Sequence, residues 1–422
     1  MLSTSMSENR ESEVLPHRDL ILINAAAFLR SLGVGLTGVV LGIYLFRIGL
    51  SSFTIGVVIA AGLAGSALAT IAVSFKADRL GRRHTLVVLS ILTSMGAVAL
   101  ALAPGLPALM AMAFVGMLNG TGTDRSACFA LEQAIIPGLV PNSRRTWSLA
   151  WYNVILDGGG ALGALGAVLP LFLQHHLAFS LPSSYRVVFF GYAGLCLIVA
   201  TLYLSLSPAI EIINPPALQK MNTVIAPERK GIITKLTALF SLDAFGGGFL
   251  TDALVAYWFF RRFGVAEHDL GLVFFAVHIL NACSHLGAAW LARRIGLVKT
   301  MVFTHLPSSL FLMAVPFVPS FKWAVVLFLC REALAEMDVP TRQSYVTALV
   351  QPSERTFASG ITNLARNVFW AVGSAAAGFL MQALAFSAPL LIGGGAKVTY
   401  DLLLYRSFRR LKAPEETLPS IE

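Results

Sequence analysis

The sequence predicts an all-α membrane protein in which twelve transmembrane helices form two pseudo-symmetric six-helix bundles. Three observations support this fold class. Of the 422 residues 56% are hydrophobic and only 13% are charged, about half the charged fraction of a soluble globular protein. Many apolar stretches reach about 20 residues, the length that a helix needs to cross roughly 30 Å of hydrocarbon. The two halves of the chain also resemble one another.

Hydropathy places one predicted helix in each long apolar stretch. The predicted helices span 20–46, 53–75, 85–104, 107–129, 147–172, 186–206, 234–260, 268–292, 300–318, 323–343, 357–381 and 384–405. One long polar stretch containing a Pro-Pro pair interrupts this series and reads as a linker. The predicted organisation is a tail (1–19), an N-terminal bundle (20–206), a cytoplasmic linker (207–233), a C-terminal bundle (234–405) and a second tail (406–422).

The basic residues predict the orientation. Roughly 20 of the 31 Lys and Arg residues fall in the even-numbered loops and the tails, and loops rich in Lys and Arg stay in the cytoplasm. We therefore expect both termini to be cytoplasmic, in the plasma (bacterial inner) membrane. The first twenty residues lack the short apolar core of a signal peptide. The net charge of +9 fits this loop bias, so no nucleic-acid partner is expected.

The two halves repeat the same sequence features in the same order. A shift of 215 residues places Arg47 and Gly49 on Arg262 and Gly264, and places ADRLGRRHT (77–85) on ARRIGLVKT. A shift of 210 pairs further positions, which are Arg145 with Arg355, Thr146 with Thr356, Asn153 with Asn363 and Glu132 with Arg342. A six-helix unit duplicated in parallel is typical of secondary transporters.

The charged loop after the second predicted helix carries a recognisable motif. Gly81 permits a tight turn, and the arginines favour the anionic cytoplasmic side of the membrane. Asp78 can pair with an arginine or with a helix N-terminus such as the one near Phe357; the alternative is that the loop supplies topogenic charge alone. We expect a cytoplasmic gate motif here, made of Asp78, Arg79, Gly81, Arg82 and Arg83.

With its G-x-L-x-D-R-x-G-R-R-like pattern, this loop resembles the loop motif of the major facilitator superfamily, and topology and duplication extend the resemblance over the whole chain. The resemblance implies alternating access, with the loop carboxylate helping to latch the halves in the outward-facing state. It suggests an efflux-type branch. However, two patterns of the drug antiporters, R-x-x-x-G on the fourth helix and G-P-x-x-G-G on the fifth, are absent from the sequence.

Ionisable residues inside the predicted spans are costly, about 2.5–3.5 kcal/mol each at the bilayer centre, and therefore mark candidate functional positions. Glu332 and Glu336 lie four apart, which suits either proton coupling or a static pair with an arginine. Asp243 and Asp252 lie nine apart, which would place them on nearly opposite faces of one helix. The candidate proton-coupling residues are Asp124, Asp157, Asp243, Glu332, Glu336 and His278.

Other polar residues in the spans suggest how a substrate could be held. Arg30 and Arg366 could bind an anionic group of the substrate, or pair with Asp124 or Asp157 when the site is empty. On the eighth helix His278 shares one face with Asn281 and His285, a pattern compatible with proton relay, metal transport or a simple polar contact. The candidate substrate-binding residues are Arg30, Asn119, Asn153, Arg366, Asn367 and Trp370.

These features favour a secondary active transporter that moves a small organic solute by alternating access, with proton-coupled export as the first hypothesis. Proton-coupled uptake of an organic anion is the alternative. A membrane-embedded enzyme is more remote because no nucleophile–base or metal constellation is recognisable, and a transporter-like sensor would need a further soluble domain. No ATP-binding loop, cofactor or resident metal is expected. The expected partners are the substrate, protons and the bilayer, and the protein is expected to be a monomer.

Overall fold

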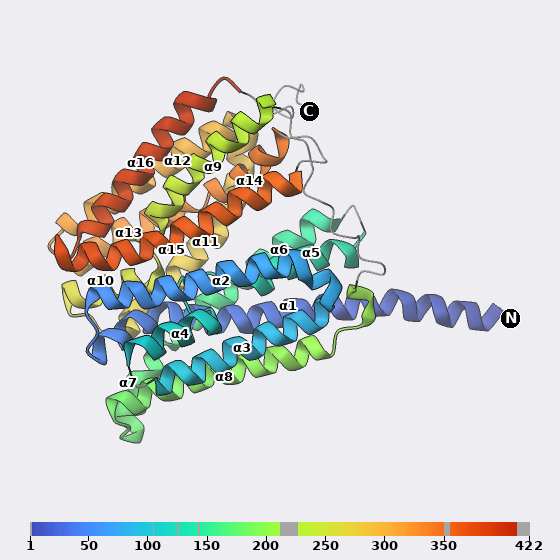
Figure 1. Ribbon diagram of the computed structural model, residues 1–422, viewed down its shortest axis with the longest axis horizontal. Coiled ribbons are helices and arrows are strands. Elements are labelled where there is room, and N and C mark those ends of the chain that lie inside the picture. Colours follow the sequence, from blue (N-terminus) through green and yellow to red (C-terminus); the bar gives the residue numbers. More distant parts are fainter. Residues whose placement is uncertain are drawn as a thin grey trace.

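The computed structural model describes residues 2–103, 105–124, 126–141, 144–211, 227–349 and 355–411. Within these ranges the chain is almost entirely helical and has no β-strand (Figure 1). The helices of the first half are α1 (Leu2–Arg47), α2 (Ser52–Leu80), α3 (Arg82–Leu102), α4 (Leu106–Gly116), α5 (Ala127–Leu139), α6 (Arg145–Leu165), α7 (Leu169–Leu177) and α8 (Leu181–Leu204). Those of the second half are α9 (Pro227–Gly248), α10 (Asp252–Phe263), α11 (Glu267–Ile295), α12 (Leu297–Ala314), α13 (Phe321–Ala335), α14 (Asp338–Ala348), α15 (Arg355–Ala383) and α16 (Ala388–Phe408).

In the described chain, nine helices are long and apolar enough to cross a membrane, and α4 and α5 are shorter apolar helices. This confirms the predicted all-helical membrane fold, while the count of twelve spans stays a prediction. Two helix starts differ most from the expected ones: α1 begins at Leu2, before the predicted start at 20, and α9 begins at Pro227, before the predicted start at 234. Most of the predicted linker, 212–226, and the last residues, 412–422, lie outside the described ranges.

Three predicted spans are each interrupted by non-helical residues, and a fourth, 147–172, passes from α6 to α7 through a 3-10 turn at Gly166–Val168. The span predicted at 107–129 stops at Gly116 and resumes at Ala127. Between these helices Gly120 and Gly122 adopt φ values of +60° and +77°, a backbone conformation that favours glycine. The side chain of Asn119 accepts a hydrogen bond from Thr121 N at 3.1 Å, which fixes the non-helical turn. Asp124 therefore lies outside the helix that carries Glu132, although a continuous helix through both positions would place the two residues on one face.

The other two breaks lie in the second half. The predicted span 234–260 divides into α9 and α10 at residues 249–251, so Asp243 and Asp252 belong to different helices. The predicted span 323–343 divides after Ala335, and α14 restarts at Asp338. Pro340 stands in the first turn of α14, where a missing backbone N–H costs nothing. The expectation that Asp243 and Asp252 point in nearly opposite directions fails, because the chain bends between them.

Helices of the two halves pack in corresponding pairs. Within the first half α1 packs against α6 and α8, and within the second α9 packs against α15 and α16. Between the halves α2 packs against α15, and α6 packs against α11. Glycines permit the close approach: a Cβ on Gly56 would lie only 2.6 Å from Ser374 O, and one on Gly378 would lie 2.4 Å from Ser52 O.

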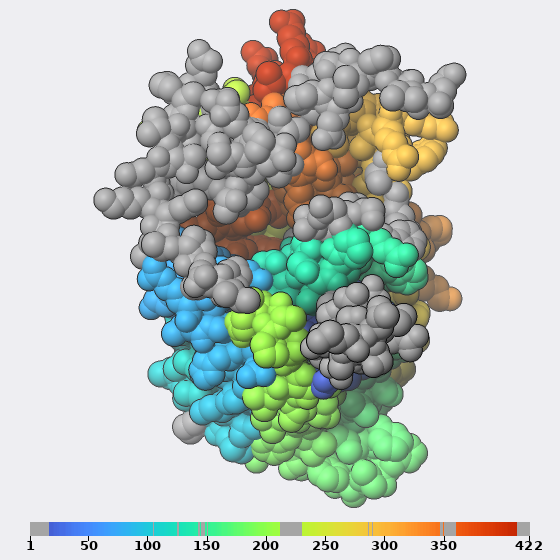
Figure 2. Space-filling model, turned by 90° about the vertical axis from the view of Figure 1, so that its right-hand side faces the viewer, coloured from blue at the N-terminus to red at the C-terminus, as the bar shows by residue number. Residues whose placement is uncertain are grey.

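The two halves share one apolar core at the end of the molecule away from the chain termini, on the left in Figure 1. This core contains buried residues of both halves, including Tyr44 and Trp258. A backbone hydrogen bond from Ala253 N to Gly120 O, 2.9 Å long, also joins the halves there. Toward the termini the cores are separate: one surrounds Tyr152 in the first half, and another surrounds Tyr400 in the second. From that end, a recess separates the blue and orange parts of the surface (Figure 2).

Candidate functional site

A polar cavity lies between the halves. Its wall begins beside the shared core, at Leu250 and Asp252, and extends to Val339 and Arg342 on α14. Thr121 and Thr123 are its lining residues from the first half, and they come from the segment between α4 and α5. The ionisable residues of its wall are Asp243, Asp252, Glu332, Glu336, Asp338, Arg331, Arg342, Arg366, Lys397, His278 and His305.

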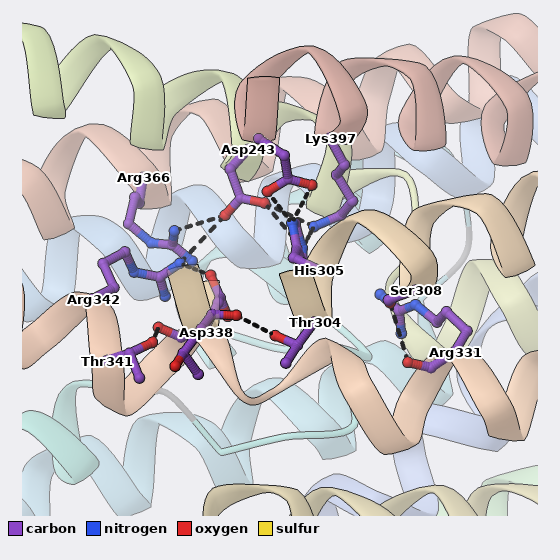
Figure 3. A network of polar contacts seen from close by, with 12 residues as sticks. Asp243, Thr304, His305, Ser308, Arg331, Asp338, Thr341, Arg342, Arg366 and Lys397 are labelled. Carbon is purple, nitrogen blue, oxygen red and sulfur yellow. Dashed lines mark hydrogen bonds and ion pairs between the residues drawn. The ribbon is translucent and has the colours of Figure 1, made fainter. Parts of the chain in front are cut away.

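Asp243 on α9 is the centre of an ion-pair network at one side of this cavity (Figure 3). Its Oδ1 accepts a hydrogen bond from Lys397 Nζ at 2.8 Å, and its Oδ2 accepts one from Arg366 at 2.9 Å. Arg342 lies 3.4 Å from the same Oδ2. His305 Nε2 is 3.7 Å from Oδ1 and 3.3 Å from Lys397 Nζ. One buried carboxylate thus contacts cations from three other helices.

The network continues away from Asp243 on both sides. His305 Nδ1 is 3.0 Å from Asp401 Oδ1 on α16, and Arg342 pairs with Asp338 at 2.5 Å. Each of these side chains is almost fully buried. Buried charges need partners because the interior cannot solvate them. The second half therefore presents to the cavity a cluster of cations whose charges are balanced, and any anionic ligand there would compete with Asp243.

A different environment surrounds Asp252, at the first turn of α10. Its Oδ2 lies 3.6 Å from His278 Nε2 on α11, and neither atom has a hydrogen-bond partner among the described residues. Asn281, one turn further along α11, has a buried Oδ1 that is likewise unpartnered within the described chain. His278 and Asn281 are 1% and 4% exposed. Buried polar atoms without partners are uncommon in folded proteins.

α13 supplies the remaining acidic residues of the cavity. Arg331 and Glu332 form an ion pair, and both side chains are largely buried. Glu336 follows the end of α13 at the bend before α14, so it is not on the same continuous helix face as the α14 residues. The structure thus places Glu332, Glu336, Asp243 and His278 around one cavity. Their predicted role in proton coupling stays a prediction.

Arg30 of α1 lies at the centre of a second, separate network inside the first half. Its guanidinium pairs with Asp124 Oδ2 at 2.5 Å and with Glu132 Oε2 at 2.6 Å. Tyr152 and Tyr203 each donate a hydrogen bond to Glu132 at 2.6 Å. This is the pairing of Arg30 with Asp124 that the sequence left open. Arg30, Asp124 and Glu132 are all buried and in ion pairs, as expected for a rigid part of the bundle.

Arg30 also lines a second cavity, which adjoins the first through Thr121 and Thr123. Asn119 and Asp124 belong to this cavity as well. Arg366, by contrast, lines the first cavity and binds Asp243. The two arginines predicted to hold one anionic group are therefore in different cavities, each paired with a carboxylate.

The two networks have opposite charge patterns at related positions. In the first half one cation, Arg30, binds two carboxylates; in the second half one carboxylate, Asp243, contacts three cations. Both central residues lie on the first helix of their half. Glu132 and Arg342 are related by the shift of 210 residues that aligns the halves in sequence. The duplicated framework therefore keeps a buried ion pair between corresponding elements but reverses its sign.

The other predicted site residues have varied positions. Trp370 lines the first cavity, while Asn153 and Asn367 line neither of the two cavities. Asp157 lies 3.9 Å from His285, between α6 and α11. Among the described residues, no three His, Cys, Asp or Glu side chains are grouped so as to hold a metal ion. The face shared by His278, Asn281 and His285 therefore divides between the cavity and a contact with α6.

Several residues of the cavity were missing from the sequence-based candidates. Asp252, Arg342, Lys397 and His305 all line it, and Asp401 contacts His305. A usable signal was present: Lys397, His305 and Asp401 are ionisable residues inside predicted apolar spans, where each charge demands an explanation. Asp252 is absent from the candidates because a continuous helix over 234–260 would point it away from Asp243.

The charged loop after α2 is tied to the start of the linker. Asp78 pairs with Arg82 at 2.8 Å, one of the options that the sequence allowed. The carboxylate of Glu211 accepts hydrogen bonds from the backbone N–H groups of Arg82 and Arg83, at 2.6 and 3.0 Å. Glu211 therefore caps the N-terminus of α3, where a negative charge is favourable. Gly81, at φ +92°, makes the turn between α2 and α3.

A model of the Major Facilitator Superfamily matches residues 23–329 and again 236–422. The chain belongs to the major facilitator superfamily. An uncharacterized membrane protein of Saccharomyces cerevisiae is 26% identical over 417 residues, covering 92% of this chain and 93% of the yeast protein. This facilitator is thus a multi-pass integral membrane protein of a transporter family, which points away from an enzyme.

Solved structures resemble this facilitator in fold. The nucleoside transporter NupG superposes with a TM-score of 0.73 at 14% identity, covering 93% of this chain and 99% of NupG. The inward-open xylose transporter XylE of E. coli gives 0.70 at 16% identity, with 92% and 96% covered. A POT family transporter in complex with 5-aminolevulinic acid gives 0.73 at 14% identity, with 95% and 97% covered. At these identities the likeness concerns the fold.

Proposed function

We propose that this facilitator is a secondary active transporter that moves a small polar organic solute by alternating access, driven by protons, with export in exchange for protons as the favoured direction. The observation that carries the proposal is the charged cavity between the halves. At one end the halves share a core, and at the other end their cores are separate. This is the arrangement expected when two bundles rock about a central site.

The positions of the basic loops support a cytoplasmic location for both termini and for the open end of the cavity. On this orientation the present conformation faces inward, and the shared core around Tyr44 and Trp258 closes the outer end. We keep the predicted domain boundaries, the plasma (bacterial inner) membrane and a monomeric state as parts of the proposal. The charged loop with Asp78 and Arg82 is then at the cytoplasmic surface and available to form a gate when the halves close.

Proton coupling is supported by the carboxyls that face the cavity. Glu332 and Glu336 line the same cavity as Asp252 and His278, with Arg331 as a nearby cation. A carboxyl in such a setting can exchange a proton when the cavity meets water from one compartment at a time. Asp124 and Asp243 are less suited to release or bind protons, because each is directly bonded to cations.

Proton-coupled uptake of an organic anion remains the second candidate. One structural relative is described as a D-xylose–proton symporter, so symport is compatible with this fold. The proposed anion clamp is weakened, however, because Arg30 and Arg366 line different cavities and each already binds a carboxylate. We therefore place export by antiport first.

The test is flux into and out of liposomes that contain the purified full chain. A pH gradient, a membrane voltage and a sodium gradient are imposed separately, and a chemically diverse solute panel is followed. Antiport requires solute flux opposite to the proton gradient, whereas symport requires flux along it. Solute flux that responds to none of the three gradients would refute the coupled mechanism.

A further inference from the structure

Three unpartnered polar atoms converge on one region of the cavity wall. They are Asp252 Oδ2, His278 Nε2 and Asn281 Oδ1, each without a hydrogen-bond partner among the described residues. All three side chains line the cavity, and those of His278 and Asn281 are more than nine-tenths buried. Two of these atoms are acceptors in every protonation state that leaves Asp252 ionised. The atoms therefore call for a ligand that donates hydrogen bonds.

The electrostatic character of this region is negative. Asp252 shares the cavity with Glu332 and Glu336, and Arg331 is the nearby cation. Asp243 with Arg342, Arg366 and Lys397 form the other region, where three cations surround one carboxylate and Arg342 also pairs with Asp338. The charged wall of the cavity therefore has one region rich in carboxylates and one in which cations gather. A ligand that matches both regions carries an ammonium group and an anionic group.

We propose that the cavity binds a zwitterionic amine, with its ammonium group at Asp252 and Asn281 and its anionic group toward Arg366 and Lys397. This proposal names the substrate class of the transporter and so rests on the proposed function. The ammonium donates hydrogen bonds to Asp252 Oδ2 and Asn281 Oδ1. The anionic group competes with Asp243 for Arg366 and Lys397. The N–H donors of these two residues already surround one carboxylate, so they are placed to bind another. His278 closes the ammonium side of the site.

The position of Asp252 also connects the site with the closed end of the molecule. A Cβ on Gly122 would lie 1.7 Å from Asp252 Oδ2, and one on Gly38 would lie 3.4 Å from Asp252 Cβ. Ala253, the next residue, donates its backbone hydrogen bond to Gly120 O of the other half. The carboxylate is therefore seated against the first half where the two halves meet. A ligand bound to Asp252 contacts a residue that moves when the halves separate at this end.

The experiment measures ligand binding to the purified full chain, by calorimetry and by thermal shift, so it does not depend on transport. The probes are α-amino acids, ω-amino acids of three to six carbons and dipeptides, with pentylamine and pentanoate as matched compounds that each carry one of the two charges. We expect at least one zwitterion to bind, with at least tenfold lower affinity for the matched amine and acid. Charge-assisted hydrogen bonds have this magnitude.

The variants separate the two regions. Asp252→Asn is expected to weaken zwitterion binding at least tenfold, and Asn281→Leu to weaken it severalfold, while Arg366→Gln weakens zwitterions but not pentylamine. Asp269→Asn is the matched control, since it removes the same charge from a half-exposed position at the start of α11. Thermal unfolding of each unliganded variant verifies folding, and Asn281→Leu keeps the test decisive if Asp252→Asn fails to fold.

Binding of no zwitterion on the panel, or unchanged affinity in Asp252→Asn and Asn281→Leu, would overturn the proposal. Coupled transport of a neutral solute without any amine binding would overturn it as well, while leaving the transporter function intact. Conversely, zwitterion binding with the expected variant pattern but no gradient-driven flux in liposomes would support the site and refute the transport mechanism.

Discussion

The buried network around Asp243 gives the sharpest quantitative prediction. Asp243→Asn removes the carboxylate that faces Lys397, Arg366 and Arg342, and so leaves Lys397 with His305 as its one remaining described neighbour in the network. Breaking a buried pair by removing one partner costs about 3–5 kcal/mol, because the remaining charge is not compensated. We therefore expect Asp243→Asn to be strongly destabilising.

Lys397→Met should cost much less, because Asp243 keeps two arginine partners at 2.9 and 3.4 Å. Loss of a single charged hydrogen bond typically costs about 1.5–3 kcal/mol. The double variant removes both charges together and should be more stable than Asp243→Asn alone. The expected coupling between the two positions is at least about 1 kcal/mol, within the range for residues of one network.

The assay is thermal and denaturant unfolding of the purified protein in one detergent, with all four members of the double-mutant cycle measured together. Asp269→Asn serves as the control, because it removes a carboxylate that is 43% exposed and paired only with His268 among the described residues. Strictly additive effects, or a Lys397→Met variant as unstable as Asp243→Asn, would show that Asp243 is not the centre of the network.

Three further predictions concern transport. Glu332→Gln should abolish the response of flux to a pH gradient while substrate binding survives, since the change removes the ionisable carboxyl and keeps the shape of the side chain. Liposome flux and calorimetry measure the two properties, and normal coupling would exclude Glu332 from the proton path. Gly122→Ala should impair closure of the outer end, because a Cβ there meets Asp252 Oδ2 and the φ of +77° disfavours a side chain. Increased labelling of cysteines introduced beneath the shared core would show the impaired closure, and unchanged labelling would contradict it. Asp78→Asn should slow turnover severalfold with substrate affinity unchanged, because the Asp78–Arg82 pair lies in the loop between α2 and α3 and outside both cavities. Weaker substrate binding at a normal turnover rate would argue against a gating role.

Hydropathy predicted the helical membrane fold because the bilayer imposes a minimum length on each apolar segment. The helix breaks escaped prediction for a physical reason. A sliding average over about 19 residues does not register a few residues of irregular backbone. At Gly120 and Gly122 the irregular backbone lies between two bundles, where Asn119 and the partner N–H of Ala253 satisfy its polar groups. Irregular backbone at membrane depth is tolerated where protein or water surrounds it.

The sequence indicated which ionisable residues belong to the candidate sites, but not which of them lie together. Arg30, Asp243, Glu332 and Arg366 were identifiable as costly ionisable residues within apolar spans. Which of them meet depends on helix order and on bends that the sequence pattern does not contain. Asp252 illustrates this: on a straight helix it would point away from Asp243, whereas the bend at 249–251 brings both to one cavity.

The reversed charge patterns of the two networks bear on which half recognises the substrate. In the first half every charge of the Arg30 group is paired within the bundle, and Tyr152 and Tyr203 complete the coordination of Glu132. Breaking such a group would leave buried charges uncompensated, so it resists rearrangement. In the second half the cations around Asp243 face the cavity, where a ligand can replace part of their coordination. The charged wall of the main cavity comes from the second half, with Thr121 and Thr123 as the contribution of the first. We therefore infer that α9 to α16 make most of the substrate contacts in the proposed transporter, and that α1 to α8 supply the opposing rigid surface.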